Sequence, residues 1–224
     1  GEVLLEGTSK KPGYRVKTGE LIEGIIPDEP NVLCPDPEPI SLDILHEDAH
    51  IIVVNKAAGM MVHPALGNYT GTLVNALLYH DVALKEVGND RSRAGIVHRL
   101  DKDTSGVVVI AKTDFALHFL QKEFKQRRVG KSYLALVEGT IDQIEGQIIL
   151  PIGRHPVKRK LMCINRKNGR YARTDWTVKE RLQKACLIEA RLHTGRTHQI
   201  RVHFYAINHP LIGDRVYQTR RNRR

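Results

Sequence analysis

The stretch that most constrains the fold is a charged loop that runs directly into a short apolar segment. The segment from Val107 to Ile110 consists only of β-branched residues, which is typical of a buried strand. The loop before it carries polar side chains between two glycines: Gly95, His98, Arg99, Asp101, Lys102, Asp103, Thr104, Ser105 and Gly106. A rigid strand with a polar loop at its end is a common way to hold a reactive group. The sequence therefore indicates a functional site with Asp101 as its first candidate, and a surface ion pair is the alternative.

The nine residues from His98 to Gly106 also resemble, in order, the catalytic motif of the RluA/RluD family of RNA pseudouridine synthases. The resemblance implies that Asp101 is the catalytic aspartate. A stacked base cannot reach a catalytic pocket, so the target nucleotide must flip out of the RNA. The resemblance further implies that Arg99 enters the vacated space, and we expect His98 in the same loop to contact RNA.

Two later segments resemble other motifs of the same family. The segment from Lys131 to Gly139 predicts a strand, and its Tyr133 resembles the active-site tyrosine that packs on the target base. A phenol offers a flat face to uracil and a hydroxyl for protons, although a strand tyrosine by itself is more often half-buried core. The segment from Leu192 to Phe204 resembles the motif whose basic residue pairs with the catalytic aspartate. We assign that role to Arg201, with Arg196 as the alternative, and we expect Arg196 to contact RNA.

The chain is basic, with 35 Lys and Arg residues against 25 Asp and Glu and a formal net charge of +10. This balance favours a polyanionic partner, nucleic acid before an anionic membrane surface. Eight basic residues and no acid gather between residues 154 and 174: Arg154, Lys158, Arg159, Lys160, Arg166, Lys167, Arg170 and Arg173. We expect a flexible hairpin or loop that neutralises RNA phosphates, with a solvated tip as the alternative. His63 is a further candidate RNA contact, or else a hydrogen-bonded structural histidine.

Proline usage and the extent of the family resemblance predict how the chain is divided. Residues 1–26 hold a segment that resembles the closing hairpin of an S4-type RNA-binding domain, so we expect a remnant of that domain or a plain β-extension. Residues 27–39 contain five of the ten prolines and are expected to form an extended, solvated linker. Residues 40–224 are expected to form the catalytic domain, truncated at its C-terminus.

Periodicity predicts the helices of this domain. Apolar residues spaced three and four apart indicate helices over residues 72–80 and 114–127, whereas residues 81–94 are expected to be an exposed loop. Thr197 is expected to be the N-cap of a last helix, whose packing face consists of Ile200, His203, Phe204 and Ile207.

Alternation with period two predicts neighbouring strands over residues 173–179 and 186–192. Together with the family resemblance, these elements give the expected fold class. It is α+β, with a mixed, largely antiparallel sheet, flanking helices and a central catalytic cleft that holds Asp101.

Several classes of protein and of site are disfavoured. The three cysteines, Cys34, Cys163 and Cys186, are scattered, which indicates neither a disulfide framework nor a zinc site and fits a reducing cytoplasm. His198 and His203 are five residues apart and do not share a helix face as a zinc pair would. No apolar run approaches the length of a membrane span. We expect no cofactor, since the sequence has no dinucleotide fingerprint and no P-loop. We also expect a monomer.

The resemblance therefore predicts an enzyme that isomerises specific uridines to pseudouridine in RNA. Similarities at Pro64 to Asn68 and Gly153 to Arg159 favour the RluD branch, which acts on large-subunit ribosomal RNA. Asp101 would act as a nucleophile or as a base, and the sequence does not choose between them. One alternative is a non-catalytic RNA-binding or ribosome-assembly module. Another is a nucleoside or glycoside hydrolase that pairs Asp101 with Asp103.

Overall fold

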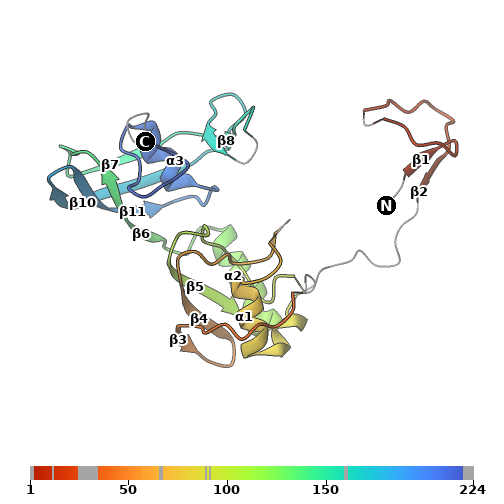
Figure 1. Ribbon diagram of the computed structural model, residues 1–224, viewed down its shortest axis with the longest axis horizontal. Helices are drawn as coiled ribbons and strands as arrows, with labels where there is room; N and C mark the ends of the chain where they lie inside the picture. Colours follow the sequence, from red (N-terminus) through yellow and green to blue (C-terminus); the bar gives the residue numbers. More distant parts are fainter. Residues whose placement is uncertain are drawn as a thin grey trace.

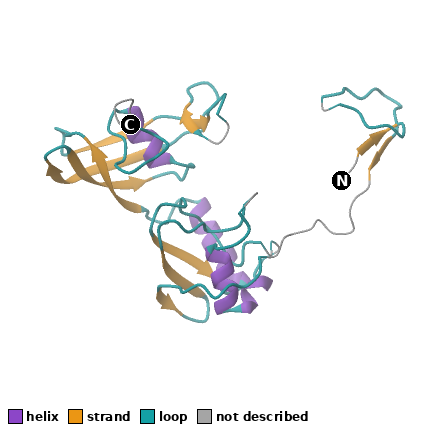
Figure 2. Ribbon diagram, viewed as in Figure 1, coloured by secondary structure: helices purple, strands orange, loops and turns teal. Residues whose placement is uncertain are grey.

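The computed structural model describes residues 3–11, 13–24, 35–65, 68–88, 90, 92–158 and 161–218. Within these residues the chain forms an N-terminal hairpin and two larger units, the first a sheet with helices and the second a sheet with one helix (Figures 1 and 2). The chain crosses from the first larger unit to the second through β6 (Figure 1). None of the described helices has the length and the apolar run that crossing a bilayer requires.

The first unit is a three-stranded antiparallel sheet packed against two helices: β3 (Ile44–Glu47), β4 (Ile51–Lys56), β5 (Gly106–Ala111), α1 (Leu73–His80) and α2 (Asp114–Lys125). Its core is made of alternate strand residues and the inward faces of both helices: Ile52, Val54, Leu73, Leu77, Val108, Ile110, Ala116 and Leu117. The strand predicted at Val107 to Ile110 is therefore present, with Val107 on the exposed side.

Hydroxyl side chains begin both helices of this unit. Thr72 and Asn75 form a reciprocal capping box at α1, and the Thr113 hydroxyl accepts a hydrogen bond from the backbone N–H of Ala116 at α2. The prediction of an exposed loop over residues 81–94 is wrong at residues 82–86. A 3₁₀ helix, η1 (Val82–Glu86), forms there, because the side chain of Leu84 completes the core beneath it.

The second unit is a four-stranded antiparallel sheet with one helix and a small hairpin. The strand order is β6 (Ser132–Glu138), β11 (Ala185–Leu192), β10 (Arg173–Leu182), β7 (Glu145–Ile149). The helix α3 (Gln199–Ala206) packs on this sheet, with the rings of Phe204 and Trp176 edge to face at 6.3 Å between centroids. The hairpin joins β8 (Ile152–Arg154) to β9 (Met162–Ile164).

The predicted α+β, antiparallel fold class is confirmed, and its sheet is divided between the two units. The predicted start of the last helix is wrong. The N-cap of α3 is His198, in a left-handed conformation with φ 57°, and not Thr197. The side chain of Gln199 provides the reason, because its carbonyl oxygen accepts the N–H of Arg196 and its amide donates to the carbonyl oxygen of Arg173.

The N-terminal hairpin pairs β1 (Val3–Leu5) with β2 (Ile22–Gly24). Its relation to an S4-type domain stays a prediction, as do the domain boundaries. Most of the expected linker, residues 27–34, lies outside the described residues. The last part of it is docked on α1, because the carbonyl oxygen of Asp36 accepts from the Asn75 amide and the Glu38 carboxylate accepts the N–H of Gly71. A fully solvated linker is therefore not observed at residues 35–39.

Candidate active site

The charged loop of residues 95–105 is held along the edge of β5. Ile96 lies opposite Ile110, and the N–H of Ala111 donates to the carbonyl oxygen of Gly95 at 3.0 Å. Two residues further on, the Nε2 atom of His98 accepts the N–H of Val109 at 3.0 Å. The side chain of His98 thus accepts a hydrogen bond from a strand N–H, a bond that a backbone carbonyl of a neighbouring strand would otherwise accept. The loop is fixed to a buried strand immediately before it reaches Asp101.

A buried lysine anchors the other side of this loop. Lys56, at the end of β4, is 2% exposed, and its Nζ donates to the carbonyl oxygens of Ala57, Met60 and Lys102 at 2.8, 2.8 and 3.1 Å. Burial lowers the pKa of Lys56, while the charges of Asp103 and Asp101 oppose that shift. Sequence reasoning did not select Lys56, since a lysine that ends an apolar strand usually extends into solvent.

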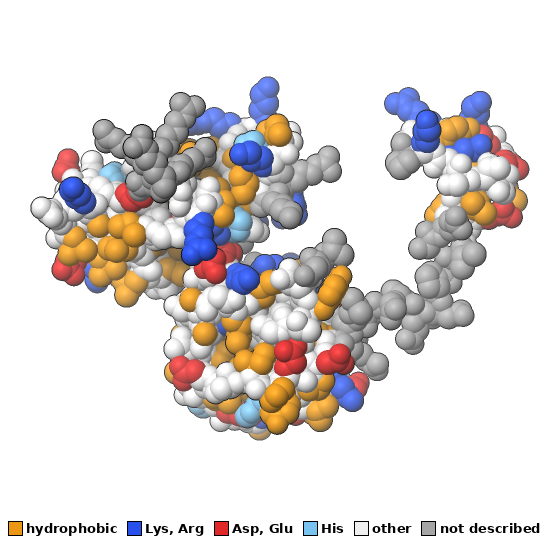
Figure 3. Space-filling model, in the orientation of Figure 1, with side chains coloured by type: hydrophobic (Ala, Val, Ile, Leu, Met, Phe, Trp, Pro, Cys, Tyr) orange, Lys and Arg blue, Asp and Glu red, His pale blue; other side chains and the backbone are white. Residues whose placement is uncertain are grey.

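Asp101 lies where the two larger units meet. The N–H of Thr104 donates to its carbonyl oxygen at 3.1 Å, which closes a turn, while the preceding Leu100 is buried in the core. Its carboxylate accepts a hydrogen bond from Nη1 of Arg201 in α3 at 3.1 Å. Figure 3 shows Lys and Arg side chains beside Asp and Glu side chains at this junction. The ion pair therefore joins an aspartate of the first unit to an arginine of the second.

Arg201 is shared between two carboxylates. Its Nε and Nη2 donate to both oxygens of Asp214 at 2.7 and 3.0 Å, while Nη1 is directed to Asp101. The Asp214 side chain is 3% exposed and also accepts the N–H groups of Val216 and Tyr217. Burial lowers the pKa of Arg201, but the hydrogen bonds and charges of the two aspartates outweigh it and the net pKa is raised. Arg201 is thus a permanent cation in a fixed orientation.

Two further side chains stand near Asp101. Tyr133, on β6, is partly buried against the core of the first unit, and burial followed by the negative charge of Asp101 raises the pKa of its hydroxyl. The Nε2 atom of His198 lies 3.9 Å from Oδ2 of Asp101. The predicted residues Asp101, Tyr133 and Arg201 therefore come together from three separate parts of the chain.

The remaining residues predicted to contact RNA have different surroundings. Arg99 is exposed next to Asp101. The ring of His98 stacks on Phe124 at 4.7 Å between centroids, and burial lowers the pKa of His98 to about 4. Burial also lowers the pKa of the half-buried His63. The Nε of Arg196 donates to the carbonyl oxygen of Tyr171.

The basic segment predicted over residues 154–174 contains the β8–β9 hairpin. Arg154 is the last residue of β8, and Lys158 is exposed in the turn that follows. His155 organises this turn, because its Nδ1 accepts the N–H groups of Val157 and Lys158. Arg159 and Lys160 lie outside the described residues.

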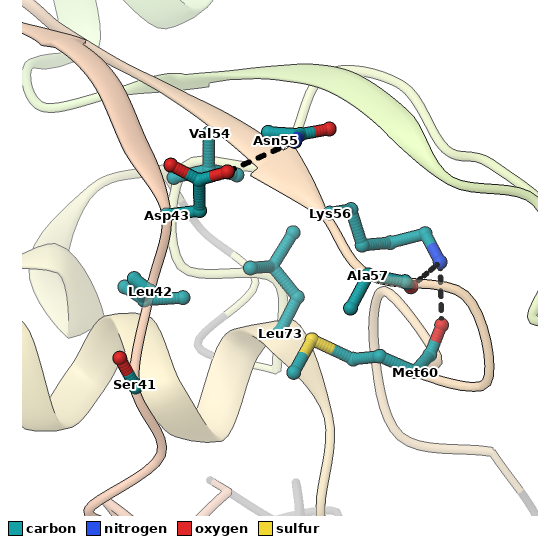
Figure 4. Close-up of a pocket in the computed structure, with 9 residues that line it drawn as sticks. All are labelled: Ser41, Leu42, Asp43, Val54, Asn55, Lys56, Ala57, Met60 and Leu73. Carbon is teal, nitrogen blue, oxygen red and sulfur yellow. Dashed lines mark hydrogen bonds between the residues drawn. The ribbon is translucent and has the colours of Figure 1, made fainter.

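A surface pocket beside β4 contains none of the predicted site residues. Figure 4 shows that Lys56 borders this pocket and directs its ammonium group to the carbonyl oxygens of Ala57 and Met60. The pocket is lined by Ser41, Leu42, Asp43, Val54, Asn55, Lys56, Ala57, Met60 and Leu73. Because its lysine already donates to backbone carbonyls, the pocket offers little chemistry of its own, and the junction around Asp101 remains the candidate site.

Comparison with known proteins gives consistent matches. The family model for RNA pseudouridylate synthase matches residues 50–206, which include Asp101, Tyr133 and Arg201. An uncharacterized RNA pseudouridine synthase of Aquifex aeolicus is 47% identical over 220 residues, covering 97% of this chain and 69% of the relative. Ribosomal large subunit pseudouridine synthase D of Nitrosomonas europaea is 48% identical over 203 residues, covering 91% of this chain and 57% of the relative.

A solved structure agrees with these matches. The structure of human RNA Pseudouridylate Synthase Domain Containing 1 superposes with a TM-score of 0.68 at 31% sequence identity. The superposition covers 83% of this chain and 74% of the human chain.

Proposed function

The chain belongs to the RNA pseudouridylate synthase family and is an isomerase of uridine in RNA, and we propose that Asp101 is its catalytic carboxylate and large-subunit ribosomal RNA its substrate. The observation that carries this proposal is the contact between Asp101 and Arg201, which lie 100 residues apart and on different units. In an ordinary surface ion pair the two partners are not anchored by buried charges. Here the buried Lys56 holds the loop that carries Asp101, and the buried Asp214 holds Arg201. That arrangement supports a site in which one carboxylate is held for chemistry.

Pseudouridine formation exchanges one bond for another. The N1–C1′ bond breaks, the uracil turns, and a C5–C1′ bond forms while the proton at C5 is lost and N1 gains one. No atom is added overall, so the reaction requires no redox cofactor. It requires one carboxylate and side chains that hold the detached base. Asp101 supplies the carboxylate, either as a nucleophile or as a base, and Arg201 keeps it in place. Tyr133 offers its ring face to the uracil.

Access to the target base requires that the nucleotide leave its stack, at a cost of a few kcal/mol. In this proposal Arg99, exposed two residues before Asp101, fills the space that the nucleotide leaves. The basic hairpin offsets part of the cost through phosphate contacts, which give affinity without reading sequence. A monomer in the cytoplasm is part of the same proposal.

The proposed substrate is tested with two transcripts. Large-subunit and small-subunit ribosomal RNA are incubated with the chain, and pseudouridine is mapped by its specific chemical adduct and primer extension. We expect new pseudouridines at a few positions of the large-subunit transcript alone. Modification only of the small-subunit transcript would refute the substrate assignment.

A further inference from the structure

The surroundings of Asp101 include a tyrosine that the reaction itself does not use. Tyr217 is 6% exposed and follows Asp214 in the segment that leads away from α3. Its ring lies under the guanidinium group of Arg201, with Cζ 5.0 Å from the ring centroid. Its hydroxyl oxygen lies 2.8 Å from Nδ1 of His198 and accepts the N–H of Met162 in β9 at 2.9 Å. The side chain of Tyr217 thus contacts Arg201 and His198, and each of these two residues also faces the carboxylate of Asp101.

We propose that Tyr217 is a positioning residue for Asp101. The ring face of Tyr217 holds Arg201, and its hydroxyl fixes His198 in the tautomer that carries its proton on Nε2. The proposal deepens the function proposed above and rests on it for its kinetic consequences. The tautomer, in contrast, is a property of the free protein.

The tautomer follows from hydrogen-bond accounting. A phenol hydroxyl has one proton to donate and can accept other hydrogen bonds. Because the oxygen of Tyr217 already accepts the N–H of Met162, its own proton is free for an acceptor, and among the described contacts that acceptor is Nδ1 of His198. A neutral imidazole that accepts at Nδ1 carries its proton on Nε2.

The charge state of His198 agrees with this reading. Burial lowers the pKa of His198, opposed by the charge of Asp101, so the ring is neutral at pH 7. Its Nε2–H side is the side that lies 3.9 Å from Oδ2 of Asp101. The carboxylate is therefore flanked by a fixed cation and a fixed N–H dipole.

The tautomer is tested directly by NMR of the chain labelled with ¹⁵N-histidine at pH 7, with His198→Gln used to assign the signal. We expect Nε2 of His198 to be protonated and Nδ1 to be unprotonated. In Tyr217→Phe, the hydroxyl is lost and we expect a mixture of tautomers. A proton on Nδ1 in the unmodified chain would overturn the proposal, whether or not the chain modifies RNA.

The kinetic test compares Tyr217→Phe with Tyr205→Phe, an exposed tyrosine of α3 whose ring lies 6.2 Å from that of Tyr217. We expect Tyr217→Phe to lower kcat about tenfold, as the loss of one hydrogen bond would, with KM within about twofold. Tyr205→Phe should keep the unmodified rate. Equal kcat in both variants would overturn the positioning role, while failure of the unmodified chain to act on RNA would instead refute the proposed function.

A rescue experiment separates positioning from general stability. The side-chain amide of glutamine lies where Nε2 of histidine would lie, whereas that of asparagine lies where Nδ1 would. We expect His198→Gln to keep kcat within about threefold and His198→Asn to lose at least tenfold. The reverse order would overturn the assignment of Nε2 as the group that faces Asp101.

Discussion

At the candidate site, the hydrogen bonds of Arg201 are distributed between two aspartates. Asp214 takes two of the hydrogen bonds of Arg201, and Asp101 takes one. Burial raises the pKa of Asp214, but its hydrogen bonds from Arg201 and from two backbone N–H groups outweigh burial and lower it. Asp214 therefore stays charged and sets the direction of the guanidinium group, and Asp101, whose side chain is 25% exposed against 3% for Asp214, is the more accessible of the two carboxylates.

The role of Asp214 gives a first prediction. Asp214→Asn removes the charge but keeps the size of the side chain, so Arg201 loses a charge-assisted anchor of about 1.5–3 kcal/mol. We expect kcat/KM to fall about 10- to 100-fold in a single-turnover assay. Asp142→Asn, an exposed carboxylate between β6 and β7, is the matched control. Activity of Asp214→Asn within twofold of the unmodified chain would contradict this role.

The buried ring of His98 predicts how stability depends on pH. Its pKa is about 4 in the folded chain against 6.5 for an ordinary histidine, so between these values the unfolded chain binds a proton that the folded chain does not. The contribution of His98 is complete above pH 6.5 and is lost as the pH falls toward 4, by up to about 3 kcal/mol. Urea unfolding of His98→Gln should show a weaker decrease over this range. Identical decreases in both proteins would refute the assignment.

At the residue scale, the sequence motif was sufficient to select Asp101, Tyr133 and Arg201, and the structure brings them together. Lys56, Asp214 and Tyr217 were not selected as site residues. Each acts through contacts with backbone carbonyls or with another side chain, and such contacts leave no spacing pattern in the sequence. Only the packed structure shows that these three side chains surround the site.

At the scale of elements, the loop of residues 95–105 works because it is tied to β5 at its start. Gly95 has φ 76°, and a Cβ atom there would collide with the carbonyl oxygen of Ala111. That oxygen belongs to the strand against which the loop is held. A side chain at this position would therefore separate the loop from β5.

We predict that Gly95→Ala lowers the free energy of unfolding by about 2–4 kcal/mol, from backbone strain and overpacking together. Gly130→Ala, where a Cβ atom would meet open space, is the matched control and should change stability by less than about 1 kcal/mol. Chemical denaturation of both variants measures these free energies of unfolding. Equal stabilities would mean that the loop is not held as described.

The basic hairpin predicts a salt dependence. If Lys158, Arg159 and Lys160 each neutralise a phosphate, changing all three to alanine should reduce the slope of log affinity against log salt by about 2. Filter binding of large-subunit RNA at several salt concentrations measures this slope. A triple alanine variant at the exposed Lys122, Lys125 and Arg127 tests whether any three charges have the same effect. An unchanged slope in the hairpin variant would show that the hairpin faces solvent.

Elements with strong local signals were predicted well. The helices α1 and α2 follow from apolar spacing, and the paired strands β10 and β11 follow from alternation. The start of α3 and the helix η1 were not predicted. The first residue of α3, Gln199, donates its side-chain amide to the carbonyl oxygen of Arg173 in β10, and Leu84 makes η1 part of a core formed by distant strands. Both depend on tertiary contacts that local patterns do not contain.

At the scale of the whole molecule, the candidate site lies at the junction between the two larger units, where Arg201 contacts Asp101. The first unit contributes Asp101 from a loop beside β5, and the second contributes Tyr133 from β6 and Arg201 from α3 (Figure 1). Sequence reasoning predicted the antiparallel α+β class, although it expected one sheet. How strands divide between sheets is set by long-range pairing, which no local pattern records.

The central claim is that Asp101 drives base isomerisation, and one measurement tests it most directly. Large-subunit ribosomal RNA is transcribed with uridine carrying tritium at C5, since that hydrogen is lost when the C5–C1′ bond forms. Tritium released to water is then compared for the unmodified chain and for Asp101→Asn, with the fold of both checked by thermal unfolding. We predict release by the unmodified chain and none above background by the folded variant. Equal release by both proteins would contradict the account.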